Sequence, residues 1–225
     1  VTTGTGTVSG GQGILATTNG TDAGDTVTVG LNGNVTSASG FGVRATGING
    51  LVKVDLNKGQ VFATGNDGIS AASSGTGGIT INTAAGTDVD ARTAGANDIE
   101  AIVTGTAGDI NIKVVGTLNL AAFAGNDAIF AQVNNAASTL NIIIESQDGI
   151  WGSNVLANTG MGIEATTNGL GAITIAANTT QSGLVFGGLD AINASITNAA
   201  NTKAVSVTAG NAAFGSTLFS NDPNG

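Results

Sequence analysis

The feature that most constrains the fold of this chain is a phrase that recurs at a period of about 30 residues along its 225 residues. Each copy has an aliphatic anchor with alanine two residues later, as in NDGISA at 66–71 and NDAIFA at 126–131. Successive anchors are 26 to 34 residues apart, and they are Ile14, Val43, Ile69, Ile99, Ile129, Ile163 and Ile192. A period of this length is typical of repeat architectures in which each unit packs on its neighbours.

Two further phrases follow each anchor. The second alternates aliphatic and polar residues and lies at 26–30, 51–55, 78–82, 109–113, 139–144, 172–176 and 204–208. The third is weaker and lies at 33–37, 59–63, 87–91, 116–120, 148–152, 183–187 and 211–215. Alternation with period two indicates half-buried strands, and the Gly, Asn, Asp, Thr and Ser between the phrases favour corners. The sequence therefore predicts three short strands in each repeat.

Three strands and three corners per repeat favour a three-sided parallel β-solenoid over a propeller or a leucine-rich repeat, whose sequence patterns are absent. We expect an all-β fold with about seven coils of ~30 residues, in one domain over 1–225, with coils starting near 11, 40, 66, 97, 126, 160 and 189. The anchors and the alanines that follow them should form inward columns. Handedness is not encoded in the pattern, but three-sided coils of this length are right-handed in known families.

Composition excludes several classes of function. The chain has no Cys and no His, so it lacks the commonest metal ligands, a Ser-His-Asp or Cys-His catalytic group and any disulfide. With 15 Asp and Glu against 6 Lys and Arg, the net charge is -9, which is the wrong sign for binding nucleic acid. No apolar run is long enough to cross a bilayer as a helix, so we expect no membrane insertion by this segment.

The coil phrase and the strands that follow it, such as GGITIN at 77–82, resemble the passenger regions of bacterial autotransporters, the type V secreted surface proteins. The resemblance covers residues 11–215. It implies a right-handed parallel β-helix displayed outside a Gram-negative cell, acting most often as an adhesin and sometimes as a protease or toxin. The absence of Cys agrees with passage through the periplasm before folding. The membrane β-barrel and signal peptide of that family are missing from this sequence.

Aspartates recur before the anchors and are the candidate metal ligands. Four of them lie at a similar register, and a fifth begins a third phrase; the set is Asp67, Asp98, Asp127, Asp148 and Asp190. Stacked carboxylates at the coil spacing would suit Ca²⁺, which takes oxygen ligands. The alternative is that Asn-Asp pairs such as Asn66-Asp67 are corner residues with local hydrogen bonds, and this interpretation is favoured. Asp67, Asp98 and Asp127 remain weak Ca²⁺ candidates, and we expect no other cofactor.

The position after each anchor should point outward. This column contains Leu15, Arg44, Ser70, Glu100, Phe130, Glu164 and Asn193. Phe130, and Trp151 on another face of the same coil, are candidate surface contacts because exposed aromatic rings can stack on sugars. Incidental exposure is the simpler explanation for both.

The sequence disfavours two other functions. Glu100 and Glu164 share the outward register two coils apart, and glycosidases use a pair of carboxylates. Phe130 stands between the two residues, so we expect no enzymatic activity. An ice-binding face needs regular threonines, and Lys and Asn interrupt the outward column of the second strands. That column was expected to contain Thr28, Lys53, Thr80, Asn111, Asn141, Thr174 and Ser206.

The sequence predicts an extracellular structural and adhesive protein of the bacterial cell surface, whose partner is a cell-surface protein or glycan. The alternative is a filament or sheath subunit that stacks end to end on copies of itself, because neither end of the sequence offers an evident cap. On this basis the chain is either a piece of a longer solenoid or a stacking subunit. A polysaccharide-active enzyme is the third and least favoured hypothesis.

Overall fold

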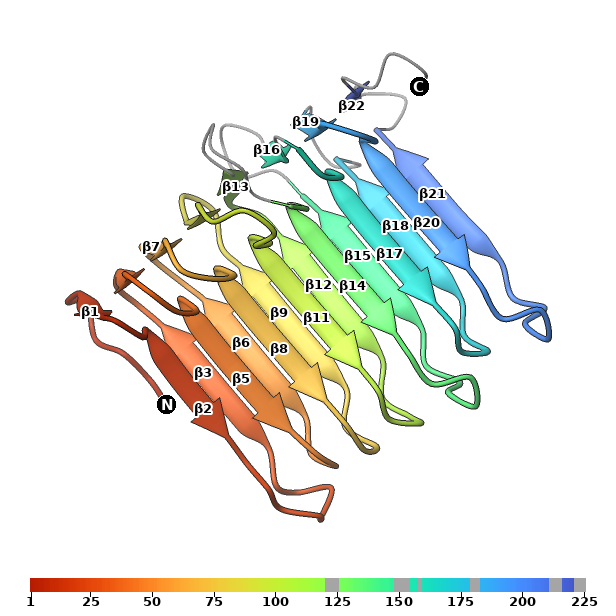
Figure 1. Ribbon diagram of the computed structural model, residues 1–225, viewed down its shortest axis with the longest axis horizontal. Coiled ribbons are helices and arrows are strands. Elements are labelled where there is room, and N and C mark those ends of the chain that lie inside the picture. The colour runs from red at the N-terminus through yellow and green to blue at the C-terminus, as the bar shows by residue number, and fades with distance from the viewer. Residues whose placement is uncertain (120–125, 148–153, 158, 179–182, 211–215, 221–225) are drawn as a thin grey trace.

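The computed structural model describes residues 1–119, 126–147, 154–157, 159–178, 183–210 and 216–220. Within these residues the regular structure is entirely β, and every pairing between strands is parallel. The strands form three sheets whose order follows the coils, which confirms the three-sided, right-handed parallel β-solenoid (Figure 1). The chain visits sheets 1, 2 and 3 in turn and then begins the next coil.

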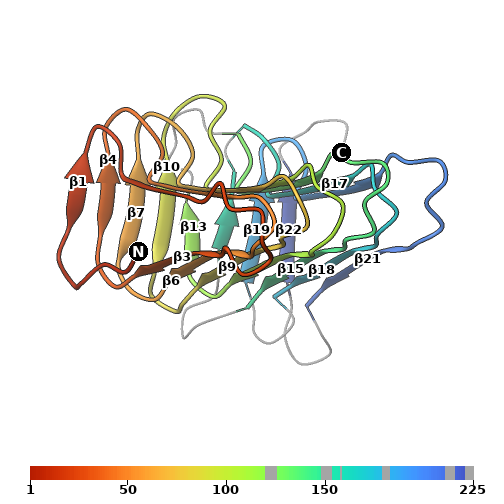
Figure 2. The same cartoon turned by 90° about the horizontal axis from the view of Figure 1, so that it is seen from below.

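Sheet 1 contains β1 (Val8–Gly10), β4 (Val35–Ser37), β7 (Gln60–Ala63), β10 (Asp88–Ala91), β13 (Thr117–Asn119), β16 (Asn154–Leu156), β19 (Gly183–Gly187) and β22 (Ser216–Ser220). Sheet 2 contains β2 (Ile14–Thr17), β5 (Val43–Gly47), β8 (Ile69–Ser73), β11 (Ile99–Val103), β14 (Ile129–Val133), β17 (Ile163–Thr167) and β20 (Ile192–Ile196). Sheet 3 contains β3 (Val27–Leu31), β6 (Val52–Leu56), β9 (Ile79–Thr83), β12 (Ile110–Val114), β15 (Ile142–Ser146), β18 (Ile173–Ala177) and β21 (Val205–Ala209). Figure 2 shows the strands of sheet 1 running between the layers formed by sheets 2 and 3.

The core consists of columns in which like residues stack from coil to coil. In sheet 2 the anchors pair with one another, for example Ile99 with Ile69 and Ile129, and the alanines pair in the same way. Sheet 3 contributes two aliphatic columns, in which Ile110 and Ile112 lie between equivalents in β9 and β15. These side chains are buried, and the predicted inward columns of sheet 2 are confirmed. Repetition of one side-chain volume at each level lets the coils pack without voids.

Polar side chains outside the core also pair between coils. Thr46 donates a hydrogen bond to Thr17 at 2.9 Å, and Asn57 donates one to Asn32 at 3.3 Å. Close backbone approach between corners requires glycine at some levels. A β-carbon on Gly105 would overlap the carbonyl group of Gly75 in the preceding coil.

One predicted strand position was wrong. The second strand of the fifth coil is Ile142–Ser146 rather than 139–144, so Ile143, not Asn141, occupies the outward column of sheet 3. A shift by two residues keeps the same faces of the strand inward and outward, so hydrophobic alternation alone does not fix the register. The predicted third strands at 148–152 and 211–215 lie outside the described residues, and the described strands of sheet 1 in those two coils are β16 and β22.

The polar segment at residues 1–10 joins the solenoid rather than lying outside it. Thr2 forms a parallel bridge with Gly30, and β1 pairs with β4. At the opposite end, β20, β21 and β22 are the last described strands of their sheets. Val207 of β21 is 46 % exposed, whereas its partner in the core column, Ile175, is 1 % exposed.

Candidate functional site

The candidate site is the corner at which the chain passes from sheet 1 to sheet 2. Two side-chain columns run along it. The corner column lies two residues before each anchor and contains Gln12, Phe41, Asp67, Asn97, Asp127, Met161 and Asp190. The outer column lies one residue after each anchor and contains Leu15, Arg44, Ser70, Glu100, Phe130, Glu164 and Asn193, and strand register confirms it as predicted.

Backbone hydrogen bonds hold the corner column in register. The N–H of the residue that follows each corner position donates to the carbonyl of the corner residue in the next coil, as Gly42 does to Asp67 and Gly68 does to Asn97, both at 3.0 Å. The corner side chains of three successive coils add a second link. Asn97 N–H donates to Asp67 Oδ1 at 2.7 Å, Asp127 N–H to Asn97 Oδ1 at 3.0 Å, and Met161 N–H to Asp127 Oδ1 at 2.7 Å. These residues therefore stack one coil on the next.

Asp98 lies one residue later than the sequence alignment of the aspartates suggested. It directly precedes its anchor, at the level where other coils have Gly68 and Ala128. The side chain is fully buried, and its Oδ1 accepts the Ala91 N–H at 2.8 Å. The Asp98 carboxyl therefore supplies the backbone N–H at the end of β10 with an acceptor.

The three candidate Ca²⁺ ligands are thus engaged with backbone N–H groups. Asp67, Asp98 and Asp127 are all at most 4 % exposed. In the described part of the chain, no group of three or more acidic, His or Cys side chains is placed to hold a metal ion. Asp148 lies outside the described residues, and Asp190 is half-buried in the corner column.

Burial raises the pKa of several of these carboxyl groups. The pKa of Asp67 rises to about 6, chiefly through burial and further through the charge of Glu100, against the hydrogen bond from Asn97. Burial also raises the pKa of Asp98 well above its ordinary value. These groups are therefore protonated at higher pH than exposed aspartates.

Asp127 and Glu164 form a hydrogen-bonded carboxyl pair across adjacent coils. Burial, and then the charge and hydrogen bond of Asp127, raise the pKa of Glu164 to about 7. Burial also raises the pKa of Asp127. A hydrogen bond between two carboxyl groups needs one proton, which these shifts place on Glu164 while Asp127 accepts.

Glu100 and Glu164 do not face each other as a catalytic pair would. The register places β14 between their strands, with Phe130 directly between the two residues. Ser70 Oγ donates to Glu100 Oε1 at 2.9 Å, while Glu164 pairs with Asp127. Phe130 is half-buried in this column, and Trp151 lies outside the described residues.

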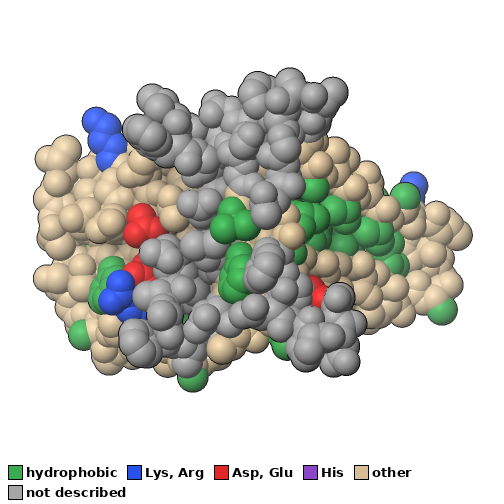
Figure 3. Space-filling model, turned by 90° about the horizontal axis from the view of Figure 1, so that it is seen from above, with side chains coloured by type: hydrophobic (Ala, Val, Ile, Leu, Met, Phe, Trp, Pro, Cys, Tyr) green, Lys and Arg blue, Asp and Glu red, His purple; other side chains and the backbone are tan. Residues whose placement is uncertain are grey.

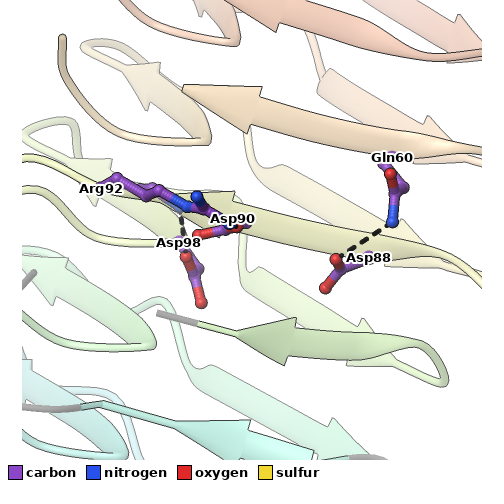
Figure 4. A network of polar contacts seen from close by, with 6 residues as sticks. Gln60, Asp88, Asp90, Arg92 and Asp98 are labelled. Atoms are coloured by element: carbon purple, nitrogen blue, oxygen red, sulfur yellow. Dashed lines mark hydrogen bonds and ion pairs between the residues drawn. The ribbon is translucent and has the colours of Figure 1, made fainter. Parts of the chain in front are cut away.

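A second acidic group lies on β10 beside the corner (Figure 4). Arg92 donates from Nε and Nη2 to Asp90 Oδ2, at 2.9 and 2.6 Å, and its guanidinium lies 4.5 Å from the centre of the Phe62 ring. Gln60 donates to Asp88 at 3.4 Å, and burial followed by the charge of Asp90 raises the pKa of Asp88 to about 6. Within the part of the chain that the structure describes, one buried oxygen each of Asp88 and Asp98 has no hydrogen-bond partner.

The first two coils have Gln12 and Phe41 at the corner position, where the next three coils have Asp67, Asn97 and Asp127. The Arg44 guanidinium lies 4.8 Å from the centre of the Phe41 ring. Gln12, Gly13, Ile14, Leu15, Phe41 and Arg44 line a pocket of about 190 Å³. Sequence reasoning missed this pocket, although the three-residue spacing between Phe41 and Arg44 places them in the two columns.

No protein-family model, curated protein or solved structure matches this chain. Among the described residues, no helix is long and apolar enough to cross a membrane.

Proposed function

We propose that the chain is an extracellular structural and adhesive protein of the bacterial cell surface, similar to an autotransporter passenger. The observation that carries this proposal is the difference between the outer faces of sheets 2 and 3. On sheet 3, polar side chains pair among themselves. Lys53 Nζ lies 2.8 Å from Asp55 Oδ2, and Asn82 Nδ2 donates to Asp55 Oδ1 at 2.8 Å. Lys113 Nζ lies 3.9 Å from Glu145 Oε2.

The outer column of sheet 2 also contains a polar pair, Ser70 with Glu100, but it presents a different kind of side chain at nearly every coil, including aliphatic, basic and aromatic groups. Leu15 and Arg44 are exposed, and Phe130 and Glu164 are half-exposed. Fixed strand pairing holds these groups at about 4.8 Å intervals. A rigid rod with a varied, non-repeating face suits recognition of a partner surface, whereas the stacked core and the corner hydrogen bonds suit a mechanical scaffold.

Binding of fluorescently labelled chain to epithelial and bacterial cells tests the proposal. Adhesion predicts saturable binding that excess unlabelled chain displaces and that heat-unfolded chain does not reproduce. Binding that rises linearly with concentration, or that native and unfolded chain share, would contradict it. We also infer that the chain has no enzymatic activity. Release of reducing sugars from polysaccharides would contradict this inference.

End-to-end assembly is the second candidate, and the last described coil favours it. Val205 and Val207 of β21 are 41 % and 46 % exposed although their partners Ile173 and Ile175 belong to the core. Leu218 of β22 is 46 % exposed and pairs with buried Val185. Figure 3 shows hydrophobic side chains gathered on the side of the C-terminal strands. A further parallel coil would cover these residues.

Negative-stain electron microscopy at rising protein concentration, with and without Ca²⁺, tests assembly. Unbranched fibres of the width of one solenoid that disappear in Val207→Lys would support it, with Thr174→Lys on the outer face of sheet 3 as the matched control. Monodisperse short rods at every concentration would contradict assembly and leave adhesion unaffected.

A further inference from the structure

The two arginines of the chain each stack on a phenylalanine ring but differ in their ionic contacts. Each guanidinium stacks on phenylalanine, Arg92 on Phe62 at 4.5 Å and Arg44 on Phe41 at 4.8 Å. Arg92 is neutralised by Asp90 through two hydrogen bonds. Among the described residues, the side chain of Arg44 has neither an ion pair nor a hydrogen bond. The Phe41 ring therefore orients the Arg44 guanidinium, and the N–H donors of the guanidinium have no partner among the described residues.

Asp67 is the acidic residue whose pKa the charge of Arg44 lowers, but its carboxyl group does not pair with the Arg44 guanidinium. The charge of Arg44 lowers the pKa of Asp67 only as the smallest of several influences. Asp67 is 4 % exposed, and its Oδ1 accepts the Asn97 N–H at 2.7 Å. The carboxyl group of Asp67 is thus committed to the stack of coils, and the guanidinium of Arg44 is available to an external anion.

The surroundings of Arg44 narrow the chemistry of that anion. The pocket of about 190 Å³ has apolar walls at Leu15, which is 67 % exposed, and at Phe41, which is half-buried. Gln12 supplies an amide that can both donate and accept, and this amide lies close to Gly40. The volume is smaller than that of a drug-sized site and suits a single ring.

We propose that the pocket formed by Gln12, Leu15, Phe41 and Arg44 binds a uronic acid unit of an acidic glycan. The sugar carboxylate would accept from the Arg44 guanidinium in the two-pronged geometry that arginine favours. The apolar face of the pyranose ring would lie against Leu15 and Phe41, and its hydroxyl groups would face the Gln12 amide. This inference rests on the proposed adhesive function and names the class of its ligand.

Titration of the ¹⁵N-labelled chain with sodium glucuronate, followed by amide chemical shifts, tests the proposal. We expect saturable shifts at residues 12–15 and 41–44, with glucose and acetate binding at least about tenfold more weakly. Arg44→Gln should weaken glucuronate binding about tenfold or more, and Arg44→Lys should recover part of it, because lysine has charge without the planar fork. Lys53→Gln, a lost cation on sheet 3, is the matched control and should bind as the parent does.

Equal shifts with glucose and glucuronate, shifts confined to other residues, or unchanged binding in Arg44→Gln would overturn the proposal. Unchanged circular dichroism and melting temperature of Arg44→Gln confirm that its fold is retained. The two proposals fail separately. A chain that binds glucuronate but no cell surface contradicts adhesion alone, and a chain that adheres to cells without binding glucuronate contradicts the pocket alone.

Discussion

Asp67 Oδ1 accepts the backbone N–H of Asn97 at 2.7 Å, and the two residues occupy the same corner position in adjacent coils. Asn97 Oδ1 repeats the contact to Asp127. Asp67 and Asn97 each accept a hydrogen bond from a backbone N–H in the next coil. These side chains therefore link coils whose corner residues are 30 positions apart in the sequence. Along the corner between sheets 1 and 2, hydrogen bonds from side chain to backbone therefore connect successive coils.

Loss of the Asn97 amide should break that chain. Asn97→Ala leaves the buried N–H of Asp127 without an acceptor, so we expect a loss of about 1–3 kcal/mol in the free energy of unfolding. The exposed Asn57, which also pairs across coils, provides the control, and Asn57→Ala should cost less than about 0.5 kcal/mol. Denaturant titration measures both values. Equal losses of unfolding free energy in the two variants would show that the corner hydrogen bond stabilises the fold no more than an exposed one does.

The carboxyl pair of Asp127 and Glu164 should make stability depend on pH. The pKa of Glu164 is about 7 and that of Asp67 about 6, whereas unfolded carboxyls ionise near pH 4. The folded chain therefore binds more protons than the unfolded chain between these values, and the free energy of unfolding should fall as pH rises from about 4 to about 7. Melting temperatures measured across this range should decrease by several degrees.

Glu164→Gln isolates the contribution of the pair. The amide can donate to Asp127 without a proton from solution, so the decrease in melting temperature with pH should become shallower. Glu145→Gln, on the outer face of sheet 3, is the control and should retain the parental slope. A melting temperature that is constant or rises between pH 4 and 7 in the parent chain is incompatible with this explanation.

The burial pattern of β15 predicts opposite outcomes for two neighbouring isoleucines. Ile144 is fully buried in a core column, whereas Ile143 lies half-exposed in the outer column of sheet 3. Ile144→Ala should cost about 2–5 kcal/mol through lost burial and a cavity. Ile143→Ala should cost less than about 1 kcal/mol. Chemical denaturation distinguishes them, and a larger loss at Ile143 would contradict the assignment of Ile144 to the core and Ile143 to the outer face of sheet 3.

Close packing of corners predicts a strong effect at Gly105. A β-carbon there would overlap the carbonyl of Gly75, so Gly105→Ala should force the two coils apart and lower stability by about 1–3 kcal/mol. Gly24 has no atom within 4 Å of an added β-carbon, and Gly24→Ala should be close to neutral. Thermal denaturation of the two variants provides the comparison. The account of the corners fails if both alanines are equally tolerated.

Most of the solenoid could be predicted from sequence because the same residue types recur at each level. The anchor at Ile99 and the alanine at Ala101 pair with their equivalents as expected, and the outer column follows from them. The register of β15 was less predictable, because a shift by two residues keeps the same side chains facing inward and alternation does not specify which residues pair.

The candidate site was less predictable than the fold. The acidic residues were recognised, but a one-residue difference in spacing places Asp98 inside the coil and Asp67 in the corner column. The pairing of Asp127 with Glu164 and the stacking of Arg44 on Phe41 join residues from different columns. Such contacts depend on side-chain direction at the corner, which sequence periodicity does not encode.

The proposed adhesive role of the outer column of sheet 2 is tested most directly by comparing two faces of the same rod. Saturable cell binding would be measured for a sheet 2 variant, Arg44→Ser with Phe130→Ser, and for a sheet 3 variant, Lys53→Ser with Ile143→Ser. We expect binding to weaken about tenfold or more only in the sheet 2 variant, with circular dichroism unchanged in both. Equal binding by the two variants, or a loss confined to the sheet 3 variant, would contradict it.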